Sequence, residues 1–351
     1  MINPEFWQGK KVLVTGHTGF KGSWLSIWLQ SLGADVLGVA LEPDNEPNLF
    51  EQANVGLGMA SVIGDICDLD FLIETVQQYQ PDIVFHLAAQ ALVRESYNDP
   101  VETYQTNVLG TMNVLEAIRA CEQVKAAVMV TTDKCYDNKE WQWPYRENDR
   151  LGGHDPYSSS KACAEILIES YRRSFFSKPD SAAIASARAG NVIGGGDWAK
   201  DRLIPDILSA YNSQKDLKIR YPEAIRPWQH VLDPLHGYLL LAEKLFSDGS
   251  EYAQAWNFGP SNDSVKPVRW IADYFAQRWS EFNWQLDGDD QLHEAGILKL
   301  DCSKAHKHLD WQPRWEIEQA LDYIIAWTDR FNEQQDMKQV CLQQIADYVN
   351  K

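Results

Sequence analysis

The feature that most constrains the fold is an alternation of short apolar runs and longer amphipathic stretches between residues 11 and 188. The apolar runs include KVLVTG, DVLGVAL, DIVFHLAA and AAVMVTT, which carry Val, Ile, Leu and Ala on both alternating positions. Strands of this kind are buried on both faces, which is typical of a parallel sheet covered by helices on each side. The alternation therefore predicts βαβ units with right-handed crossovers. We expect an α/β fold built on a Rossmann-type, doubly wound parallel sheet.

The pattern loosens from about residue 189, where shorter helices alternate with segments rich in Trp and Pro. Because apolar residues persist there, this part predicts a second folded unit rather than a linker. We expect a Rossmann domain over residues 1–188 and a smaller, mixed α/β substrate domain over residues 189–351, with the chain returning to the first domain around residues 229–262. The segment after Arg330 is expected to form a peripheral helix.

Composition and charge exclude several classes of protein. The chain has 351 residues, 44% of them apolar, and a formal net charge of −18, which opposes binding to nucleic acids and to anionic membranes. No apolar run reaches the roughly 20 residues of a membrane helix, so a cytoplasmic protein is expected. The six cysteines form no CxxC pair and no metal-ligand spacing. We expect no metal site, and we interpret Cys135 as apolar filling rather than a nucleophile.

A glycine-rich turn follows the first strand. In VLVTGHTGFKGSWL, three glycines, Gly16, Gly19 and Gly22, stand between an apolar run and the start of a helix. Glycine lets the backbone turn sharply and approach a pyrophosphate, whose charge then faces the free amide groups of the helix end. The spacing is GxxGxxG rather than GxGxxG, and a tight turn without a ligand is the alternative. The context of strand, turn and helix favours a dinucleotide site.

Two acidic residues follow the next strands. Glu42 lies after DVLGVAL, where an acidic residue would bind the ribose hydroxyls of NAD; a solvated loop carboxylate is the alternative. Asp65 follows the third strand, where it would receive an adenine amino group or form a turn. For Glu42 and for Asp65, the sequence leaves open both the cofactor-binding role and the structural alternative.

A polar cluster follows the fifth apolar run. TTDK places a hydroxyl, a carboxylate and an ammonium in succession at Thr132, Asp133 and Lys134, beyond the carboxyl end of a buried strand. In the next helix, Tyr157 and Lys161 are four residues apart and so share one face. The ammonium would favour the phenolate of the tyrosine, which could then accept a proton from a sugar hydroxyl.

Five motifs occur in one order along the chain: TGxxGxxG, HLAAQ, TTDK, YxxxK and NVIGGGD. Together they resemble the extended short-chain dehydrogenase/reductase family over roughly residues 9–330. Within that family, the chain is most similar to the nucleotide-sugar 4,6-dehydratases. The pair Asp133-Lys134 stands where relatives acting on dTDP-glucose or GDP-mannose carry Asp-Glu or a single Glu. The resemblance therefore implies CDP-glucose as the substrate.

The resemblance also implies a reaction and a set of roles. Oxidation at carbon 4 of the hexose acidifies the proton on carbon 5, and loss of that proton with the carbon-6 hydroxyl eliminates water. Thr132 would donate to the carbon-4 oxygen, Asp133 would be the acid at carbon 6, and Lys134 would be the base at carbon 5. An ammonium cannot accept a proton, so that base requires a depressed pKa; an ion pair that only orients Asp133 is the alternative.

NAD is the implied cofactor, with NADP left open, and a nucleotide sugar and a second copy of the chain are the implied partners. The dimer would form through the helices that contain residues 101–118 and 157–171. The implied cofactor-binding residues are Gly16, Thr18, Gly19, Phe20, Gly22, Asp65, Ile66, Ala88, Tyr157 and Lys161. The substrate-binding residues are Arg94, Asn191, Arg202 and Arg226, with a salt bridge as the alternative for Arg94. A nucleotide-sugar 4-epimerase and a non-catalytic NAD-binding protein are the competing functions.

Overall fold

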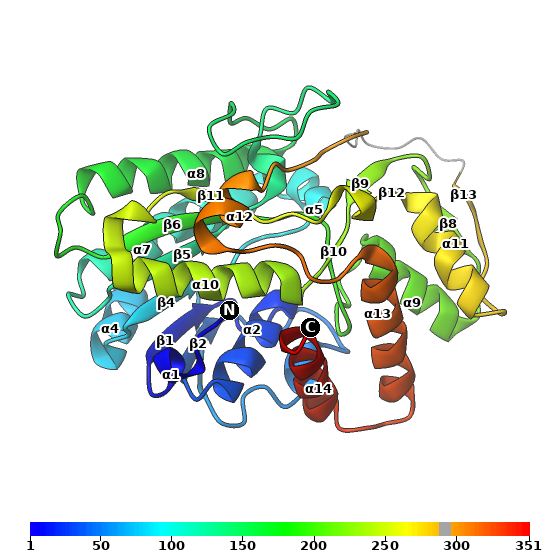
Figure 1. Cartoon of the computed structure of the whole chain (residues 1–351), viewed down its shortest axis with the longest axis horizontal. Coiled ribbons are helices and arrows are strands. Elements are labelled where there is room, and N and C mark those ends of the chain that lie inside the picture. The colour runs from blue at the N-terminus through cyan, green and yellow to red at the C-terminus, as the bar shows by residue number, and fades with distance from the viewer. Residues whose placement is uncertain (288–295) are drawn as a thin grey trace.

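The computed structural model describes residues 1–287 and 296–351. A parallel sheet of seven strands forms its centre, in the order β11-β6-β5-β4-β1-β2-β3 (Figure 1). The strands are β1 (Lys11–Thr15), β2 (Asp35–Ala40), β3 (Ala60–Ile63), β4 (Ile83–His86), β5 (Ala126–Val130), β6 (Ala183–Arg188) and β11 (Ala255–Asn257). The predicted fold class, a doubly wound α/β sheet, is confirmed.

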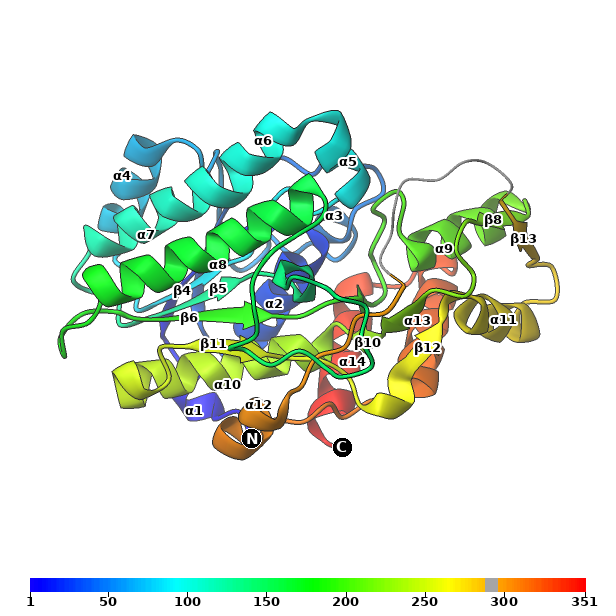
Figure 2. The ribbon, with the colours of Figure 1, turned by 90° about the horizontal axis from the view of Figure 1, so that it is seen from above.

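Helices cover both faces of this sheet (Figure 2). On one face lie α4 (Leu69–Tyr79), α7 (Thr111–Arg119) and α8 (Pro156–Ser174), and on the other lie α2 (Phe20–Ser31) and α10 (Leu232–Asp248). Alternate residues of one strand serve the two layers: Val12 and Val14 belong to the core under α2 and α10, and Leu13 to the core under α7 and α8. This explains the continuous apolar runs in the sequence.

The strand order reverses beside β1. The chain runs outward through β2 and β3 on one side, and through β4, β5 and β6 on the other, with Val12 opposite both Val36 and Ile83. Ligands of open parallel sheets bind at such a reversal, beyond the carboxyl ends of the strands. The glycine turn after β1 and the TTDK segment after β5 both lie at that edge.

The helix expected to contain residues 101–118 includes a change of helix type. It consists of α6 (Pro100–Tyr104), a π-helical turn at Gln105–Gly110, and α7. Within the π turn, Asn107 donates to the backbone oxygen of Gln90 at 3.0 Å and to Ser160 Oγ at 2.9 Å. The wider turn thus carries an amide that ties α8 to the loop after β4.

Short strands and helices make up the remainder. The strand pairs are β7 (Val192–Ile193) with β10 (Gln229–His230), β9 (Ile225–Pro227) with β12 (Val265–Pro267), and β8 (Leu217–Ile219) with β13 (Trp284–Leu286). The helices α9 (Leu203–Ser213), α11 (Val268–Arg278) and α13 (Ile317–Asn332) enclose a separate apolar core. The chain returns to the large sheet between these parts, because α10 packs on its face and β11 pairs with β6.

The last helix, α14 (Met337–Val349), packs against α2, as expected for a peripheral helix. Its Tyr348 hydroxyl donates to Asp233 Oδ1 at 2.8 Å and so ties α14 to α10. The other short helices are α1 (Pro4–Trp7), α3 (Leu49–Gln52), α5 (Val93–Asn98) and α12 (Ser303–Leu309), with 3₁₀ turns at Asp133–Cys135, Gly249–Glu251 and Asn262–Ser264. Within the two described ranges, no helix combines the length and apolarity needed to cross a membrane.

Candidate active site

A cavity of about 1940 Å³ extends from the carboxyl edge of the large sheet toward α9 and β9. Its lining includes the loops that follow β1, β2, β3, β4 and β5, together with residues from the smaller strand pairs. All of the residues predicted from the sequence to bind cofactor or substrate, or to act in catalysis, line this one cavity. The fold therefore gathers segments that are up to about two hundred positions apart in the chain into one place.

The glycine turn forms one end of the cavity. Gly16 has φ +77°, and a Cβ there would lie 2.6 Å from the backbone nitrogen of Ala88. A Cβ on Gly22 would lie 2.0 Å from the Gly16 oxygen, so both positions require glycine. Helix α2 begins directly after Gly19, and no side chain caps its first amide groups. The turn thus has the open backbone donors that a pyrophosphate needs.

The two acidic residues after β2 and β3 lie on the rim of the cavity. Glu42 and Asp65 are both exposed. Asp65 Oδ1 accepts a hydrogen bond from the backbone nitrogen of Cys67 at 2.8 Å, so its turn role is present. Both carboxylates also line the cavity, and the binding roles stay predictions.

The TTDK segment begins where β5 ends. Thr132 Oγ1 accepts from the backbone nitrogen of Lys134 at 3.3 Å and donates to Asp133 Oδ1 at 3.1 Å. Asp133 is 1% exposed, and its Oδ2 atom has no hydrogen-bond partner among the residues that the structure describes. A Cβ at Gly190 would lie 1.8 Å from that oxygen, so only glycine leaves room for the carboxyl group.

Burial raises the pKa of the Asp133 carboxyl. The Lys134 ammonium, the Thr132 hydrogen bond and the Arg226 guanidinium oppose this shift. Desolvation prevails, which favours the protonated carboxyl. A protonated carboxyl is the form that can donate a proton to a leaving hydroxyl.

Tyr157 and Lys161 project from the first turns of α8, and both are buried. Burial raises the pKa of Tyr157 to about 12, while the hydrogen bond with Thr132 and the charge of Arg202 act to lower it. The sequence-based expectation of a lowered pKa is therefore wrong for the chain alone, because burial outweighs the nearby cations. Burial also lowers the Lys161 pKa to about 8, against the charge of Glu165.

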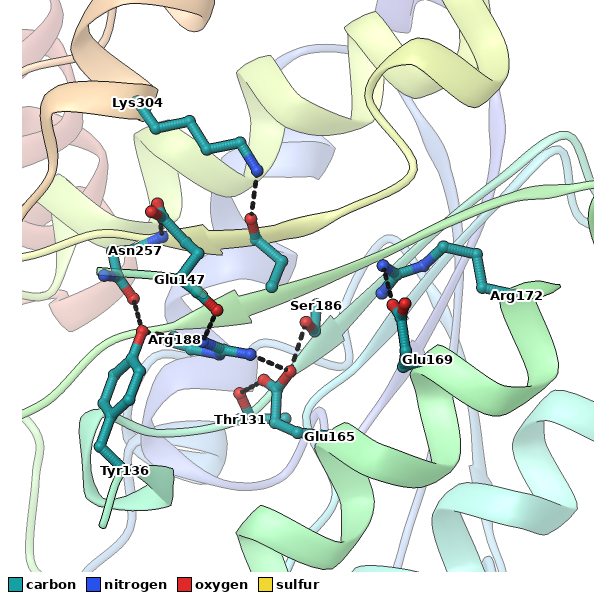
Figure 3. Close-up of polar contacts among 11 residues, drawn as sticks. Thr131, Tyr136, Glu147, Glu165, Glu169, Arg172, Ser186, Arg188, Asn257 and Lys304 are labelled. Carbon is teal, nitrogen blue, oxygen red and sulfur yellow. Dashed lines mark hydrogen bonds and ion pairs between the residues drawn. The ribbon is translucent and has the colours of Figure 1, made fainter. Parts of the chain in front are cut away.

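A buried ion pair joins α8 to β6, one helical turn after Lys161 in the sequence (Figure 3). Arg188 of β6 donates to Glu165 Oε2 at 2.7 Å, and the exposed fractions of the two side chains are 3% and 2%. Ser186 also donates to Glu165 Oε2 at 2.7 Å, and Thr131 donates to Oε1. Because Glu165 lies one turn beyond Lys161, this network fixes the face of α8 that carries Tyr157 and Lys161 against β5 and β6.

Four residues were predicted to bind the substrate. Arg226 donates to the backbone oxygen of Ile225 at 3.1 Å, and its charge acts on Asp133. Asn191 adopts φ +45°, and its Nδ2 atom has no partner within the described part of the chain, so a donor is available in the cavity. Arg202 pairs with Asp197 at 3.2 Å. Arg94 pairs with Asp201 at 3.0 Å, so the predicted alternative, a salt bridge, is present, although Arg94 also lines the cavity.

Sequence reasoning missed two residues that line the cavity, Lys21 and Gly190, and a third, Tyr238, that contacts Lys21. Lys21 extends from the glycine turn into the cavity and donates to the Tyr238 hydroxyl at 3.2 Å. Burial, together with the charges of Lys161 and Arg202, lowers its pKa to about 7. Tyr238 on α10 is fully buried, and its electrostatic partners are Asp133 and Tyr157. Lys21 had a signal in the sequence, a charged residue inside an apolar turn; Tyr238 and Gly190 had none.

All six cysteines are free. Cys135 is fully buried, and burial raises the pKa of its thiol, which disfavours the nucleophilic thiolate. No group of His, Cys, Asp and Glu side chains in residues 1–287 and 296–351 is arranged to hold a metal ion.

Comparisons with known proteins agree with this fold. Residues 13–324 match the family model described as GDP-mannose 4,6 dehydratase, so the chain belongs to that family, within the extended short-chain dehydrogenases/reductases. The CDP-glucose 4,6-dehydratase of Salmonella typhimurium is 50% identical over 100% of this chain and 99% of that protein.

Solved structures share the fold. An epimerase of Methanothermobacter thermautotrophicus aligns with TM-score 0.80 at 23% identity, covering 94% of this chain and 96% of that one. A dTDP-glucose 4,6-dehydratase of Bacillus anthracis, solved in complex with NAD, aligns with TM-score 0.75 at 21% identity, covering 93% and 98%. The family predicted from the five motifs is confirmed by the matched family model and by the relative that is 50% identical.

Proposed function

We propose that this protein is a CDP-glucose 4,6-dehydratase, which converts CDP-glucose to CDP-4-keto-6-deoxyglucose, a precursor in deoxysugar and O-antigen biosynthesis. One observation carries the proposal: Thr132, Asp133 and Lys134 lie in one cavity with the Tyr157–Lys161 pair, in a chain that is 50% identical over its full length to a protein of that name. Oxidation at carbon 4, with NAD as the hydride acceptor, does not require Asp133 or Lys134. The acid and ammonium serve the loss of water.

The cofactor is NAD, and the residues present fit it. The glycine turn leaves backbone donors and the helix end free for a pyrophosphate, and the cavity continues from there to Tyr157. Bound beside Tyr157, this cofactor would supply the hydride acceptor at carbon 4 of the hexose and the hydride donor at carbon 6. The predicted cofactor-binding residues are retained in this proposal.

The side chains of the cavity perform the proton transfers. Tyr157 accepts the proton of the carbon-4 hydroxyl once the positive charges of Arg202 and of bound NAD offset the burial that raises its pKa, and Thr132 donates to the resulting ketone oxygen. Asp133, whose burial favours the protonated form, gives its proton to the carbon-6 hydroxyl as water leaves. Lys134 takes the proton from carbon 5 and returns one there. An ion pair that only orients Asp133 is the competing role for Lys134.

The remaining roles follow from the same cavity. Arg226, Arg202 and Arg94 supply guanidinium groups for the diphosphate, and Asn191 supplies its unpartnered amide. The smaller strand pairs and α9, α11 and α13 form a nucleotide-sugar-binding domain. These assignments make the substrate bridge the two parts of the chain.

A homodimer is proposed through the helices predicted for it. Val101, Leu109 and Ile166 expose 64%, 49% and 59% of their surface on α6, the π turn and α8. These helices run side by side on one face of the molecule (Figure 2). Apolar side chains on adjacent helices favour burial against a second copy.

The free cysteines support a cytoplasmic location.

Product analysis tests the proposed activity. Purified protein is incubated with NAD and, in separate reactions, CDP-, dTDP-, GDP- and UDP-hexoses. We expect CDP-glucose to lose the mass of one water and to give the alkaline enone absorbance of a 4-keto sugar. A 4-epimerase, the second candidate, would leave the mass unchanged. No turnover of any nucleotide sugar would favour a non-catalytic NAD-binding protein.

A further inference from the structure

The proposed reaction requires one cofactor molecule to stay in the site through the whole cycle, and this inference rests on that reaction. The hydride that leaves carbon 4 must return at carbon 6 of the same sugar. If the reduced cofactor left between these two steps, the oxidised sugar would have no hydride to accept. The conversion therefore needs a part of the protein that keeps the cofactor in the cavity, in addition to the groups that transfer protons.

A run of three glycines passes close to the glycine turn. A Cβ on Gly194 would lie 2.9 Å from Cζ of Phe20, one of the residues predicted to bind the cofactor. Gly196 has φ +81°, and a Cβ there would lie 2.6 Å from Cδ1 of Leu49 on α3. Because glycine has no side chain, this backbone can run in contact with both the glycine turn and α3. We call residues 194–198 the strap.

Hydrogen bonds fasten the strap to the loop after β2 and to α3. Asn45 Nδ2 donates to the backbone oxygen of Trp198 at 2.9 Å, and Trp198 Nε1 donates to Gln52 Oε1 at 3.1 Å. The loop itself is fixed by Asn48, whose Nδ2 donates to the Asn45 oxygen at 3.1 Å and whose Oδ1 accepts from the backbone nitrogen of Glu51 at 2.9 Å. The strap is thus held by a loop that has its own hydrogen bonds.

Other contacts hold the strap from α2 and α13. Trp24 of α2 donates from Nε1 to the backbone oxygen of Gly195 at 3.0 Å. The Trp198 ring packs against Phe331 and Trp327 of α13, with ring centroids 5.3 Å and 6.4 Å apart. The strap and the loop after β2 are two walls of the large cavity, which is lined by Asn45 and Asn48 of the loop and by Gly196 and Trp198 of the strap.

We propose that the strap, fastened through Asn45 and Trp198, retains the reduced cofactor in the cavity between oxidation at carbon 4 and return of the hydride at carbon 6. Neither residue transfers a proton or a hydride; both are positioning residues that hold two walls of the cavity together. Release of the cofactor requires these walls to separate, which breaks the two hydrogen bonds of Asn45 and Trp198. Loss of one such bond should change the release rate by roughly two- to ten-fold.

Two variants each remove one of these bonds. Asn45→Ala removes the donor to the Trp198 oxygen, and Trp198→Phe removes the indole N–H while it keeps an aromatic ring against α13. The matched controls are Asn283→Ala and Trp143→Phe, because both of these side chains are exposed and neither lines the cavity.

Release of the cofactor is measured first, without substrate. Each protein is loaded with radiolabelled NADH and then mixed with excess unlabelled NADH. We expect release to be roughly two- to ten-fold faster from Asn45→Ala and from Trp198→Phe than from the wild type, and unchanged in the two controls. If one variant loses its thermal unfolding transition, the other decides the outcome.

A label experiment tests the consequence for the reaction. CDP-glucose with deuterium at carbon 4 is converted by the NAD-loaded protein in the presence of unlabelled NAD and NADH. The wild type and both controls should keep the deuterium in the new methyl group, whereas Asn45→Ala and Trp198→Phe should lose part of it to exchange with the solution. Unchanged release together with full retention of deuterium in both variants would refute the strap. Absence of keto sugar from the wild type would instead refute the proposed function, and the release rates would still test the strap.

Discussion

Replacing Glu165 with Gln is expected to destabilise the protein far more than the same change at Glu169, one turn further along α8. Figure 3 shows the two carboxylates on that helix, each beside an arginine. Glu165 and Arg188 are almost fully buried, whereas Glu169 exposes 41% of its side chain and pairs with Arg172 and Arg173. The two substitutions are chemically identical and differ in burial, so Glu169→Gln is a matched control.

The expected loss of unfolding free energy depends on which charged group each substitution leaves without a counter-charge. In Glu165→Gln the Arg188 guanidinium stays buried without a counter-charge, which costs about 3–5 kcal/mol in comparable buried pairs. The hydrogen bonds from Thr131 and Ser186 lose their charged acceptor as well. In Glu169→Gln water and the remaining contacts replace the carboxylate, so the expected cost is about 0–1 kcal/mol.

Urea unfolding of both variants and the wild type measures this difference, with NAD absent so that ligand binding adds nothing. The catalytic consequence is separate: Glu165 acts to raise the Lys161 pKa, so Glu165→Gln lowers that pKa below about 8. Less Lys161 is then an ammonium at neutral pH, and the alkaline loss of activity should begin at a lower pH. If the two variants unfold at the same urea concentration, the reasoning about the buried pair is wrong.

Three further predictions concern the cavity. Gly190→Ala should displace the Asp133 carboxyl and so abolish the loss of water, while oxidation at carbon 4 persists. Accumulation of reduced cofactor measures this outcome. The control is Gly296→Ala, whose Cβ would meet its nearest atom at 3.5 Å. Lys21 has a folded pKa of about 7 against an ordinary 10.5, so the unfolded chain binds more protons between these values. Lys21→Met should therefore raise the free energy of unfolding at neutral pH, with a gain that shrinks as the pH approaches 10.5; a constant gain would contradict this. Lys134→Met should stop solvent exchange at carbon 5 and spare the initial oxidation, and persistence of exchange, followed by mass spectrometry, would support the ion-pair role.

Local patterns were sufficient for the sheet and for the positions of the motifs. Strands buried on both faces have continuous apolar runs, and helical spacing alone puts Tyr157 and Lys161 on one face of α8. The glycine turn was likewise predictable, because part of its constraint is local: a Cβ on Gly22 would meet the Gly16 oxygen within the same turn.

Contacts between distant segments were not predictable in the same way. Asp133 requires glycine at position 190, and Lys21 contacts Tyr238 on α10. In neither pair does the sequence around one residue contain a pattern that identifies the other. The break to a π turn within residues 101–121 also depends on a distant group, Ser160, which accepts from Asn107. Such pairings follow from how the helices pack on the sheet.

The sequence by itself determined which chemical groups the protein has and the order in which the fold presents them: a glycine turn, a hydroxyl–acid–ammonium segment and a tyrosine–lysine helix. Only the tertiary structure decided the state of those groups. Tyr157 illustrates the difference, since its neighbour in sequence suggests a lowered pKa and its burial raises it to about 12. The physical reason is that desolvation is a property of the whole surrounding shell, and that shell is assembled from segments far apart in the chain.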